Sequence, residues 1–375
     1  MYMKKIIIII IGIFLALGVF YFLKIPQSNN KAGLLPSPKP EKTTYNFLLL
    51  GFGGGVHEGT YLTDTIMVAH VDTKIKKATL FSIPRDLWVS LPTKSGADFH
   101  TKINAVYQLE LFPKDYPDLK QTSTKIVVSQ ITGLPIDGYV SVNFEGFTKV
   151  IDILEGIDVE VKRSFTDLEY PIEGKEKELC DKETEDLFKK AEPFTTPGFN
   201  PEERNQLFKD EPKFEEFMKN ATDSPELVFP CRYEKLEFKA GANHLDGTMA
   251  LKFARSRHSP DDGGDFNRAL RQQQVIEAIK NKVINLGFIP KIIPLMNEFK
   301  DDVKTDIGLN IIKKLISQAD KVKEYKTTTF VLTDQNVLKN TISDDRQYIL
   351  IPREGMDNWK GIQKIINSTS SASFK

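Results

Sequence analysis

The sequence is poor in the residues that build metal centres and disulfide frameworks. Its 375 residues include two cysteines and five histidines, and no two histidines are four positions apart. Two cysteines exclude a disulfide-rich mini-fold and a four-cysteine zinc site, and the scattered histidines argue against a histidine-built metal centre. Lysine plus arginine and aspartate plus glutamate number 51 each. Because the net charge is zero, no nucleic-acid partner is expected.

The charge that is present is unevenly distributed. Hydrophobic residues make up 40% and charged residues 27%, which is typical of a globular chain, and the length allows one large domain or two small ones. Residues 164–238 hold 20 acidic and 11 basic residues, whereas the rest holds 31 acidic and 40 basic residues. This acidic segment lacks a sustained apolar period, so we interpret it as an insertion on the rim of a basic domain.

The N-terminal residues have the pattern of a membrane anchor. Residues 6–23 form a run of 18 without a charge, which as a helix spans about 27 Å of a bilayer core of about 30 Å. Lys4 and Lys5 precede the run, which favours a cytoplasmic N-terminus. The alternative is a cleaved secretory signal, but no small-x-small site follows. We expect a single-pass protein of the cell membrane, with the lipid bilayer as a partner.

These observations predict four segments. Residues 1–5 are a cytoplasmic stub, residues 6–23 one N-terminal transmembrane helix, residues 24–44 an extracytoplasmic linker rich in proline, and residues 45–375 an exported domain with the acidic insertion. Outside the cytoplasm an isolated pair of cysteines is expected to be bridged. Cys180 and Cys231, both in the insertion, are therefore a candidate disulfide, worth about 4 kcal/mol on the chain-entropy estimate.

Apolar runs and helical periodicities alternate along the exported part. Strands are expected at residues 45–50, 65–71, 78–83, 139–142, 157–161 and 328–332. Helices are expected at residues 103–112, 122–131, 144–154, 245–253, 267–286, 289–299, 307–322 and 359–366. Strands interleaved with helices predict an α/β or α+β sandwich with a central sheet.

The first candidate site lies where a glycine-rich loop, residues 51–59, follows the first predicted strand. Val56 stands where a dinucleotide-binding motif needs its third glycine, and a strand follows where that fold needs a helix. The loop is interpreted as backbone that can approach a ligand closely. Asp64 opens the next strand beside it, where one carboxylate and phosphate oxygens suffice for Mg²⁺. A plain turn residue is the alternative for Asp64.

A second group of polar residues follows the third predicted strand. Arg85 and Asp86 are adjacent, so on extended chain their side chains point in opposite directions, one into a site and the other supporting it. A surface ion pair is the alternative. Lys102 and Asn104 then supply a cation and an amide at the start of a helix.

The strongest cluster holds four arginines within 17 residues: Arg255, Arg257, Arg268 and Arg271. Arg255 and Arg257 share a face on extended backbone. Asp265, Arg268 and Gln272 share one face of a helix, and Asp265 falls at the helix start, where an acid is favoured. Guanidinium groups in this arrangement suit a diphosphate, whose oxygens they bind in pairs. A solvated basic helix is the alternative.

These motifs, in this order, resemble the LytR-CpsA-Psr (LCP) family of bacterial cell-envelope proteins. The resemblance covers residues 45–286 apart from the acidic insertion. It rests on Leu48-Leu49-Leu50-Gly51, Leu62-Thr63-Asp64, Ser82-Ile83-Pro84-Arg85-Asp86, Lys102-Ile103-Asn104, Phe144 to Asp152, Gly156 to Val161, Leu245-Asp246-Gly247 to His258, and Asp265 to Gln273.

The resemblance implies an α/β/α sandwich with a central mixed sheet that binds a polyprenyl (di)phosphate. It implies an enzyme that moves a glycopolymer-phosphate from a polyprenyl-diphosphate carrier to a peptidoglycan hydroxyl with Mg²⁺. Asp64 would be the metal-associated carboxylate, and Asp64, Arg85, Asp86 and Arg257 would be catalytic. The residues that would hold the carrier's phosphates are Arg85, Lys102, Asn104, Arg255, Arg257, Arg268, Arg271 and Gln272.

The sequence departs from the family pattern at one position. Many members have an aspartate two residues after the glycine that ends the first strand, where this chain has Gly53. His57 or Glu58 in the same loop is a candidate replacement. Two alternative functions therefore stay open: a polyprenyl-diphosphate hydrolase that uses water as acceptor, and a regulatory protein that binds the lipid carrier without turnover.

Overall fold

The computed structural model of the chain describes residues 42–55, 59–194, 200–286, 302–308, 310–311, 314 and 325–371. They divide into two units, each described by itself. Unit 1 comprises Met1–Glu160, Ala242–Ala254 and Arg268–Lys375. Unit 2 comprises Val161–Gly241 and Arg255–Asn267.

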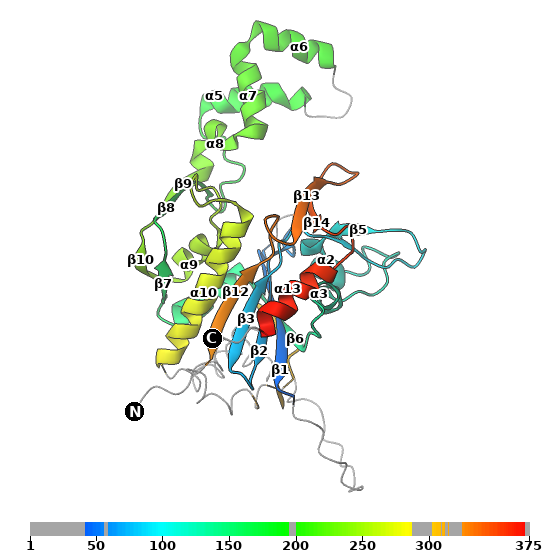
Figure 1. Ribbon diagram of the computed structural model, residues 1–375. Coiled ribbons are helices and arrows are strands. Elements are labelled where there is room, and N and C mark those ends of the chain that lie inside the picture. Colours follow the sequence, from blue (N-terminus) through cyan, green and yellow to red (C-terminus); the bar gives the residue numbers. More distant parts are fainter. Residues whose placement is uncertain are drawn as a thin grey trace, which may run out of the picture. The chain divides into compact units, whose positions relative to one another are not determined.

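A six-stranded mixed sheet forms the centre of unit 1 (Figure 1), in the order β11-β6-β1-β2-β3-β12. Its strands are β1 (Thr44–Phe52), β2 (Thr63–Asp72), β3 (Lys77–Ser82), β6 (Gly138–Asn143), β11 (Val303–Thr305) and β12 (Lys326–Val331). β1 pairs with β6, and β3 with β12, in parallel, and the other pairs are antiparallel. These directions place the ends of β1, β3, β6 and β12 and the start of β2 at one edge, which we name the upper edge.

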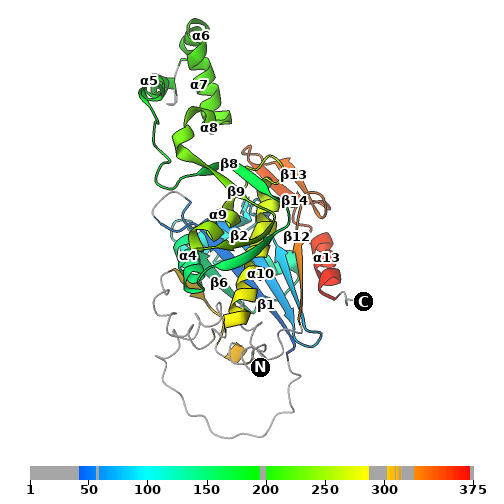
Figure 2. The same ribbon diagram turned by 90° about the vertical axis from the view of Figure 1, so that its left-hand side faces the viewer.

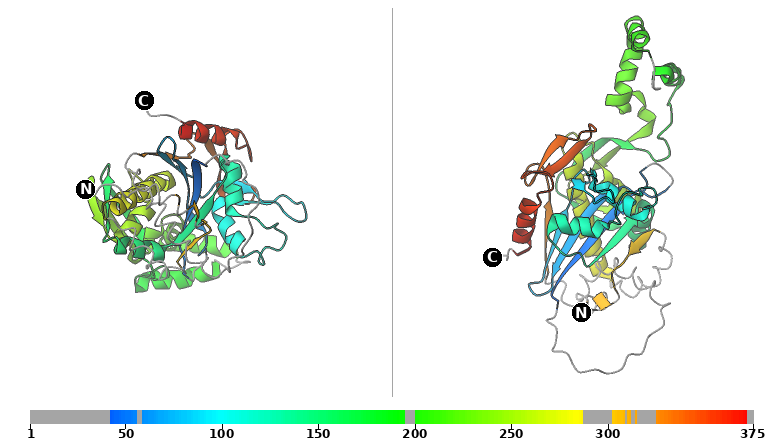
Figure 3. Two further views of the ribbon diagram at one scale, coloured as in Figure 1. Left: turned by 90° about the horizontal axis from the view of Figure 1, so that it is seen from below. Right: turned by 90° about the vertical axis from the view of Figure 1, so that its right-hand side faces the viewer.

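Helices cover both faces of this sheet (Figures 2 and 3), so the α/β/α expectation is confirmed for the described residues. One face is apolar and includes Phe47, Met67 and Leu80, against which Ile153 of α4 (Phe144–Ile153) and Ile276 of α10 (Gly264–Leu286) pack. The other face carries α2 (Val106–Leu111), α3 (Thr124–Thr132) and α13 (Lys360–Ser371). Three hydrogen bonds hold these helices: Tyr107 to Ser141, Gln363 to the Gln130 carbonyl, and Lys77 to the Thr369 carbonyl.

A glycine brings α9 (Gly247–Arg255) onto α4. The Gly247 N–H donates to Asp152 Oδ1 at 2.7 Å, and a Cβ at this position would lie 2.3 Å from the Thr148 carbonyl oxygen. No other residue fits there without moving one helix away from the other.

In unit 1 short pairs of strands accompany the central sheet, and of these strands only the one at residues 157–161 was predicted from the sequence. β4 (Trp88–Ser90) pairs with β5 (His100–Lys102), and the 3₁₀ turn η2 (Ile103–Ala105) follows β5. β13 (Leu338–Ile342) and β14 (Tyr348–Pro352) form a hairpin whose Leu350 N–H donates to the Asp86 carbonyl at 3.0 Å. β7 (Ile157–Val161) and β10 (Gly241–Leu245) form a further pair. The C-terminal hairpin thus supports the segment that carries Arg85 and Asp86.

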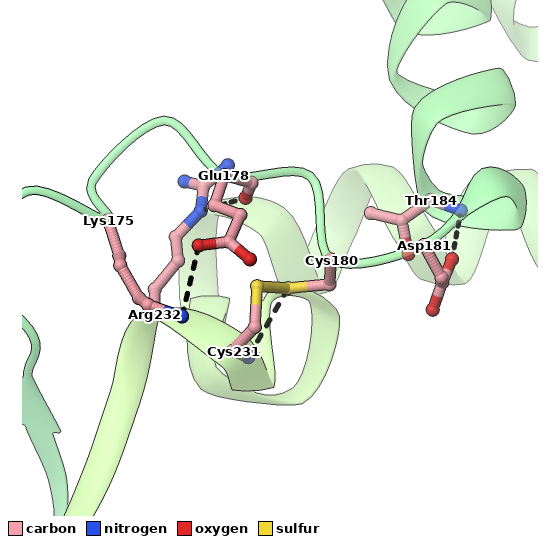
Figure 4. The surroundings of a disulfide bond; sticks show 7 residues. All are labelled: Lys175, Glu178, Cys180, Asp181, Thr184, Cys231 and Arg232. Atoms are coloured by element: carbon pink, nitrogen blue, oxygen red, sulfur yellow. Dashed lines mark hydrogen bonds and ion pairs between the residues drawn. A yellow bond between two sulfur atoms is a disulfide. The ribbon is translucent and has the colours of Figure 1, made fainter.

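Unit 2 contains the acidic insertion, which is a folded helical module. β8 (Phe165–Pro171) pairs with β9 (Tyr233–Phe238), and between them lie α5 (Lys182–Ala191), η3 (Glu192–Phe194), α6 (Pro201–Asp210), α7 (Pro212–Asp223), α8 (Pro225–Val228) and η4 (Pro230–Arg232). Phe214, Phe217 and Phe229 form its small core. The Cys180–Cys231 disulfide closes the module at its base (Figure 4), which confirms the predicted bridge.

Most predicted strands and helices match the structure to within a few residues at their ends, but residues 103–105 form a 3₁₀ turn and residue 245 ends β10. The helices expected at residues 289–299 and 307–322 lie wholly or largely outside the described residues, as do the transmembrane helix and most of the linker. Among the residues that are described, no helix is long and apolar enough to cross a bilayer.

We predict that the disulfide stabilises the helical module and has no effect on the stability of unit 1. The double variant Cys180→Ser/Cys231→Ser should lose about 4 kcal/mol of stability in the module, because its unfolded loop is no longer closed. Limited trypsin digestion should then cut the lysine-rich helices between residues 182 and 219 faster, while the central sheet stays protected. Equal protection of the module in variant and wild type would contradict this.

We predict a second stability effect from His70, whose imidazole Nδ1 lies 2.6 Å from Asn46 Oδ1 beneath the helical layer that contains α13. Burial lowers the pKa of His70. The negative charge of Asp72 acts in the opposite direction, and the positive charge of Lys77 lowers the pKa further. The unfolded chain therefore takes up the proton first, and stability should fall as pH drops below about 6.5, by at most about 1.4 kcal/mol per pH unit. The free energy of unfolding of His70→Gln, measured with urea, should depend less on pH in this range. An unchanged pH dependence would contradict the assignment.

Candidate functional site

Four charged side chains form a continuous chain at the upper edge of the sheet. Arg85 Nη1 lies 2.6 Å from Asp64 Oδ1, and Arg85 Nε lies 3.8 Å from Asp86 Oδ2. Lys102 Nζ then lies 2.7 Å from Asp86 Oδ1. The Asp64 side chain is 36% exposed and that of Asp86 is 14% exposed. We call these four residues the charged chain.

Backbone hydrogen bonds place the charged chain. Arg85 and Asp86 sit in a turn closed by the Leu87 N–H on the Pro84 carbonyl at 3.1 Å. The Asn104 N–H donates to the Arg85 carbonyl at 3.2 Å, which ties η2 to this turn. The expectation that the Arg85 and Asp86 side chains point in opposite directions was wrong, because it assumed extended backbone where the chain turns. Asn104 is brought to the site by its backbone, and its carbonyl also accepts from Thr63 Oγ1 at 3.2 Å.

The arginines of α10 belong to the same edge. Lys280 donates to Thr327 near the start of β12 at 3.1 Å, and Gln273 donates to Ser82 at the end of β3 at 2.8 Å. Towards its N-terminus α10 therefore extends past the upper edge, and these turns carry Arg268 and Arg271. Both arginines are buried, with 7% and 2% exposure, which argues against the alternative of a solvated basic helix.

Two of the predicted site residues at this end of α10 have different surroundings. Asp265 lies in the first turn of α10, as expected for a helix start. Gln272 donates to the Ala254 carbonyl at 3.4 Å, so its amide braces the end of α9.

Arg255 and Arg257 belong to unit 2. Arg255 ends α9, so the expected extended backbone was wrong there, and its guanidinium lies 5.7 Å from the centroid of the Tyr170 ring. Arg257 is exposed, and its Nε lies 3.2 Å from His258 Nε2. The two side chains therefore have different surroundings and do not form a repeated pair on one strand face.

Asp167 organises this arginine segment and was missed by the sequence analysis. Its Oδ2 accepts from the Ser256 hydroxyl at 2.7 Å and from the N–H groups of Arg257 and His258 at 2.9 and 3.2 Å. Burial tends to raise the pKa of Asp167, but these bonds and the Glu169 N–H lower it to below its usual value. The carboxylate is therefore ionised and acts as an anchor. The sequence feature that could have identified Asp167 is its position as an acid on the inward face of a strand, two residues after Phe165.

The glycine-rich loop keeps its backbone close to the start of α4. Gly54 has φ +75°, and a Cβ there would lie 2.9 Å from Asn143 Cβ. The Gly53 carbonyl accepts from the Phe144 N–H at 3.3 Å. The candidate replacements His57 and Glu58 lie outside the described residues.

Asp64 meets the minimum requirement for a Mg²⁺ ligand. One of its two carboxylate oxygens accepts from Arg85, and the side chain is partly exposed. Mg²⁺ needs one or two protein carboxylates when phosphate and water supply the rest. In the described part of the chain no three His, Cys, Asp or Glu side chains cluster as a metal cage, so a site here would depend on the ligand's own oxygens.

Fold and charges together define an α/β/α protein with basic groups gathered at one sheet edge, which is suited to an anionic phosphate ligand. The LytR_cpsA_psr family model matches residues 25–365, and the chain belongs to this family.

Similar proteins agree with this assignment. The chain is 27% identical over 270 residues to the polyisoprenyl-teichoic acid–peptidoglycan teichoic acid transferase TagV of Bacillus subtilis, covering 72% of this chain and 51% of that protein. It is 24% identical over 278 residues to the transferase of the same type, TagU, of Enterococcus faecalis, covering 73% and 65%. The chain thus spans about half to two thirds of the length of these relatives. The crystal structure of B. subtilis TagV shares the fold, with a TM-score of 0.53 at 22% identity over 89% of this chain and 100% of that one.

We predict that Asp167→Asn loosens the arginine segment. An amide replaces an ionised acceptor that binds several donors, and each such bond to a charged group contributes about 1.5–3 kcal/mol. Amide hydrogen exchange at residues 256–258 should become roughly tenfold faster or more. Asp261→Asn, with an exposed side chain in the same unit, is the matched control. Unchanged exchange in Asp167→Asn would show that the carboxylate does not order the segment.

Proposed function

We propose that the protein transfers a glycopolymer-phosphate from a polyprenyl-diphosphate carrier to a hydroxyl of peptidoglycan. The observation that carries the proposal is the charged chain: two carboxylates and two cations in contact at a sheet edge, next to the end of α10 that holds Arg268 and Arg271. The function named for the two relatives, transfer of polyisoprenyl-linked teichoic acid to peptidoglycan, supports the same chemistry.

The two positive and two negative charges of the charged chain cancel, so these four side chains differ from a purely basic anion-binding site. A diphosphate needs additional positive charge, and the buried Arg268 and Arg271 are the candidates for it in unit 1. Arg255 and Arg257, which belong to unit 2, stay candidates from the sequence. Planar guanidinium groups bind phosphate oxygens in pairs and offset their charge. The apolar face of the sheet, bordered by the partly buried Val142, Ile153 and Ile276, is the candidate surface for the lipid tail.

The proposed reaction is a displacement at phosphorus. The acceptor hydroxyl oxygen forms a new P–O bond to the phosphate that carries the glycopolymer, and the P–O bond to the polyprenyl phosphate breaks. The hydroxyl proton passes to a carboxylate, for which Asp64 and Asp86 are the candidates. Arg85, fixed between these two carboxylates, offsets the negative charge that develops on the phosphate oxygens and the leaving group.

We further propose two conditions for this activity. Asp64 would hold Mg²⁺, and the ion would supply positive charge against the phosphate oxygens. Residues 6–23 would anchor the protein in the cell membrane as a single-pass protein with its domain outside the cytoplasm, which is where a lipid-linked substrate meets peptidoglycan. The apolar run and its flanking lysines support this arrangement.

Product analysis tests the transfer. The protein is incubated with Mg²⁺ and a polyprenyl-diphosphate oligosaccharide, with and without a peptidoglycan acceptor, and the products are identified by mass spectrometry. A phosphodiester between the two glycans, formed only with acceptor, is the expected result. Release of the oligosaccharide phosphate with water alone would identify a hydrolase, and bound lipid without turnover would identify a binding protein.

We predict that Arg85→Lys lowers kcat/KM for transfer by about 10²–10³-fold, because a single ammonium cannot span both carboxylates and the phosphate as a planar guanidinium does. Stability should change by less than about 1 kcal/mol, since the ion pair is partly exposed. Arg353→Lys, at an exposed arginine whose guanidinium donates to the Asp334 carbonyl, is the matched control and should keep full activity. Full activity of Arg85→Lys would rule out a phosphate-binding role for Arg85.

A further inference from the structure

The β4–β5 pair presents an aromatic surface that continues from the charged chain. Trp88 pairs with Lys102, and Ser90 pairs with His100. Residues two apart on a strand share a face, as do directly paired residues on neighbouring strands. The side chains of Trp88, Lys102 and His100 therefore lie on one face of this pair.

The rings of Trp88 and His100 are stacked, with centroids 6.3 Å apart and planes at 11°. His100 Nε2 lies 2.9 Å from Asp357 Oδ2, and the side chains of His100 and Asp357 are 18% and 38% exposed. Asp357 has φ +57°, in the left-handed region that aspartate tolerates better than most residues. Trp88 is itself only partly buried, so an indole, an imidazole and a carboxylate meet at the surface.

This surface adjoins a residue with a proposed role in the reaction. Lys102, the strand partner of Trp88, binds Asp86 at 2.7 Å. Asp86 is also two residues from Trp88 along the chain. A molecule that rests against Trp88 therefore lies next to one of the two carboxylates proposed to take the proton from the acceptor hydroxyl.

The chemistry of the three side chains fits a neutral sugar ring. The apolar C–H face of a pyranose packs against an indole, whose flat apolar body and polar N–H suit surfaces that are partly exposed to solvent. A carboxylate accepts hydrogen bonds from sugar hydroxyls, and an imidazole can accept or donate them. An anionic phosphate would instead be repelled by Asp357, so this surface is distinct in kind from the phosphate-binding arginines.

We propose that Trp88, His100 and Asp357 form the subsite that binds the acceptor pyranose of the peptidoglycan glycan strand and brings its hydroxyl to the charged chain. The proposal rests on the transfer function proposed above and names the place where the acceptor sits. The donor's own sugars share the pyranose chemistry, so the experiment separates the two sources.

Intrinsic fluorescence offers a direct binding test, because the sequence contains two tryptophans, Trp88 and Trp359. In the Trp359→Phe variant, Trp88 is the remaining indole. Titration with a GlcNAc–MurNAc tetrasaccharide from peptidoglycan, in the full chain and without donor, should shift or quench its emission saturably. No change up to millimolar tetrasaccharide would overturn the subsite.

Kinetics then separate acceptor from donor. Trp88→Ala should raise the KM for the acceptor about tenfold, with the KM for the polyprenyl-diphosphate donor and kcat within about twofold. Trp88→Phe should recover most of the loss, which a purely structural defect in β4 would not allow. A rise in the donor KM alone would assign the surface to the donor sugar and overturn the proposal.

The subsite and the transfer function can fail separately. If the parent protein forms no glycan–phosphate–glycan product with acceptor present, the transfer function fails, whatever Trp88 does, and the acceptor assignment falls with it. If the parent transfers normally and Trp88→Ala transfers with unchanged acceptor KM, the function stands and the subsite is wrong.

Discussion

The arrangement of the upper edge depends on one ion pair, between Arg85 and Asp64 at 2.6 Å. Asp64 is the second residue of β2, and Arg85 lies in the turn that follows β3, so the antiparallel pairing of these strands brings the two together. Partly exposed ion pairs contribute at most about 1 kcal/mol to stability. Keeping four charges in contact here therefore has little value for folding, and we propose that it fixes a guanidinium before a substrate arrives.

The rest of the structure supports this pair from several sides. The C-terminal hairpin bonds the Asp86 carbonyl through the Leu350 N–H, and Gln273 of α10 bonds Ser82 at the end of β3. In unit 2, the buried Asp167 performs a comparable task for the segment that carries Arg255 and Arg257. In each case a buried polar group or backbone bond orients an arginine-bearing segment, whereas the apolar core holds the sheet and helices.

The sequence predicted those parts of the molecule that depend on local pattern. The first three strands could be predicted because each is an apolar run, and the disulfide because an isolated pair of cysteines is expected to be bridged if the domain is exported. Long-range contacts could not be predicted. The turn at Arg85 and Asp86 depends on Asn104. Asp167 accepts a hydrogen bond from Ser256, which lies 89 residues further along the sequence. The strands β4 and β5 have three residues each, too few to show a period, so Trp88 and His100 received no role.

We propose above all that Arg85, held by Asp64 and Asp86, binds the phosphate of the lipid carrier. A crystal structure of the protein with a short-chain polyprenyl diphosphate would test this. We expect phosphate oxygens within hydrogen-bond distance of the Arg85 guanidinium, at the upper edge of the sheet. A diphosphate bound without contact to Arg85 would contradict it.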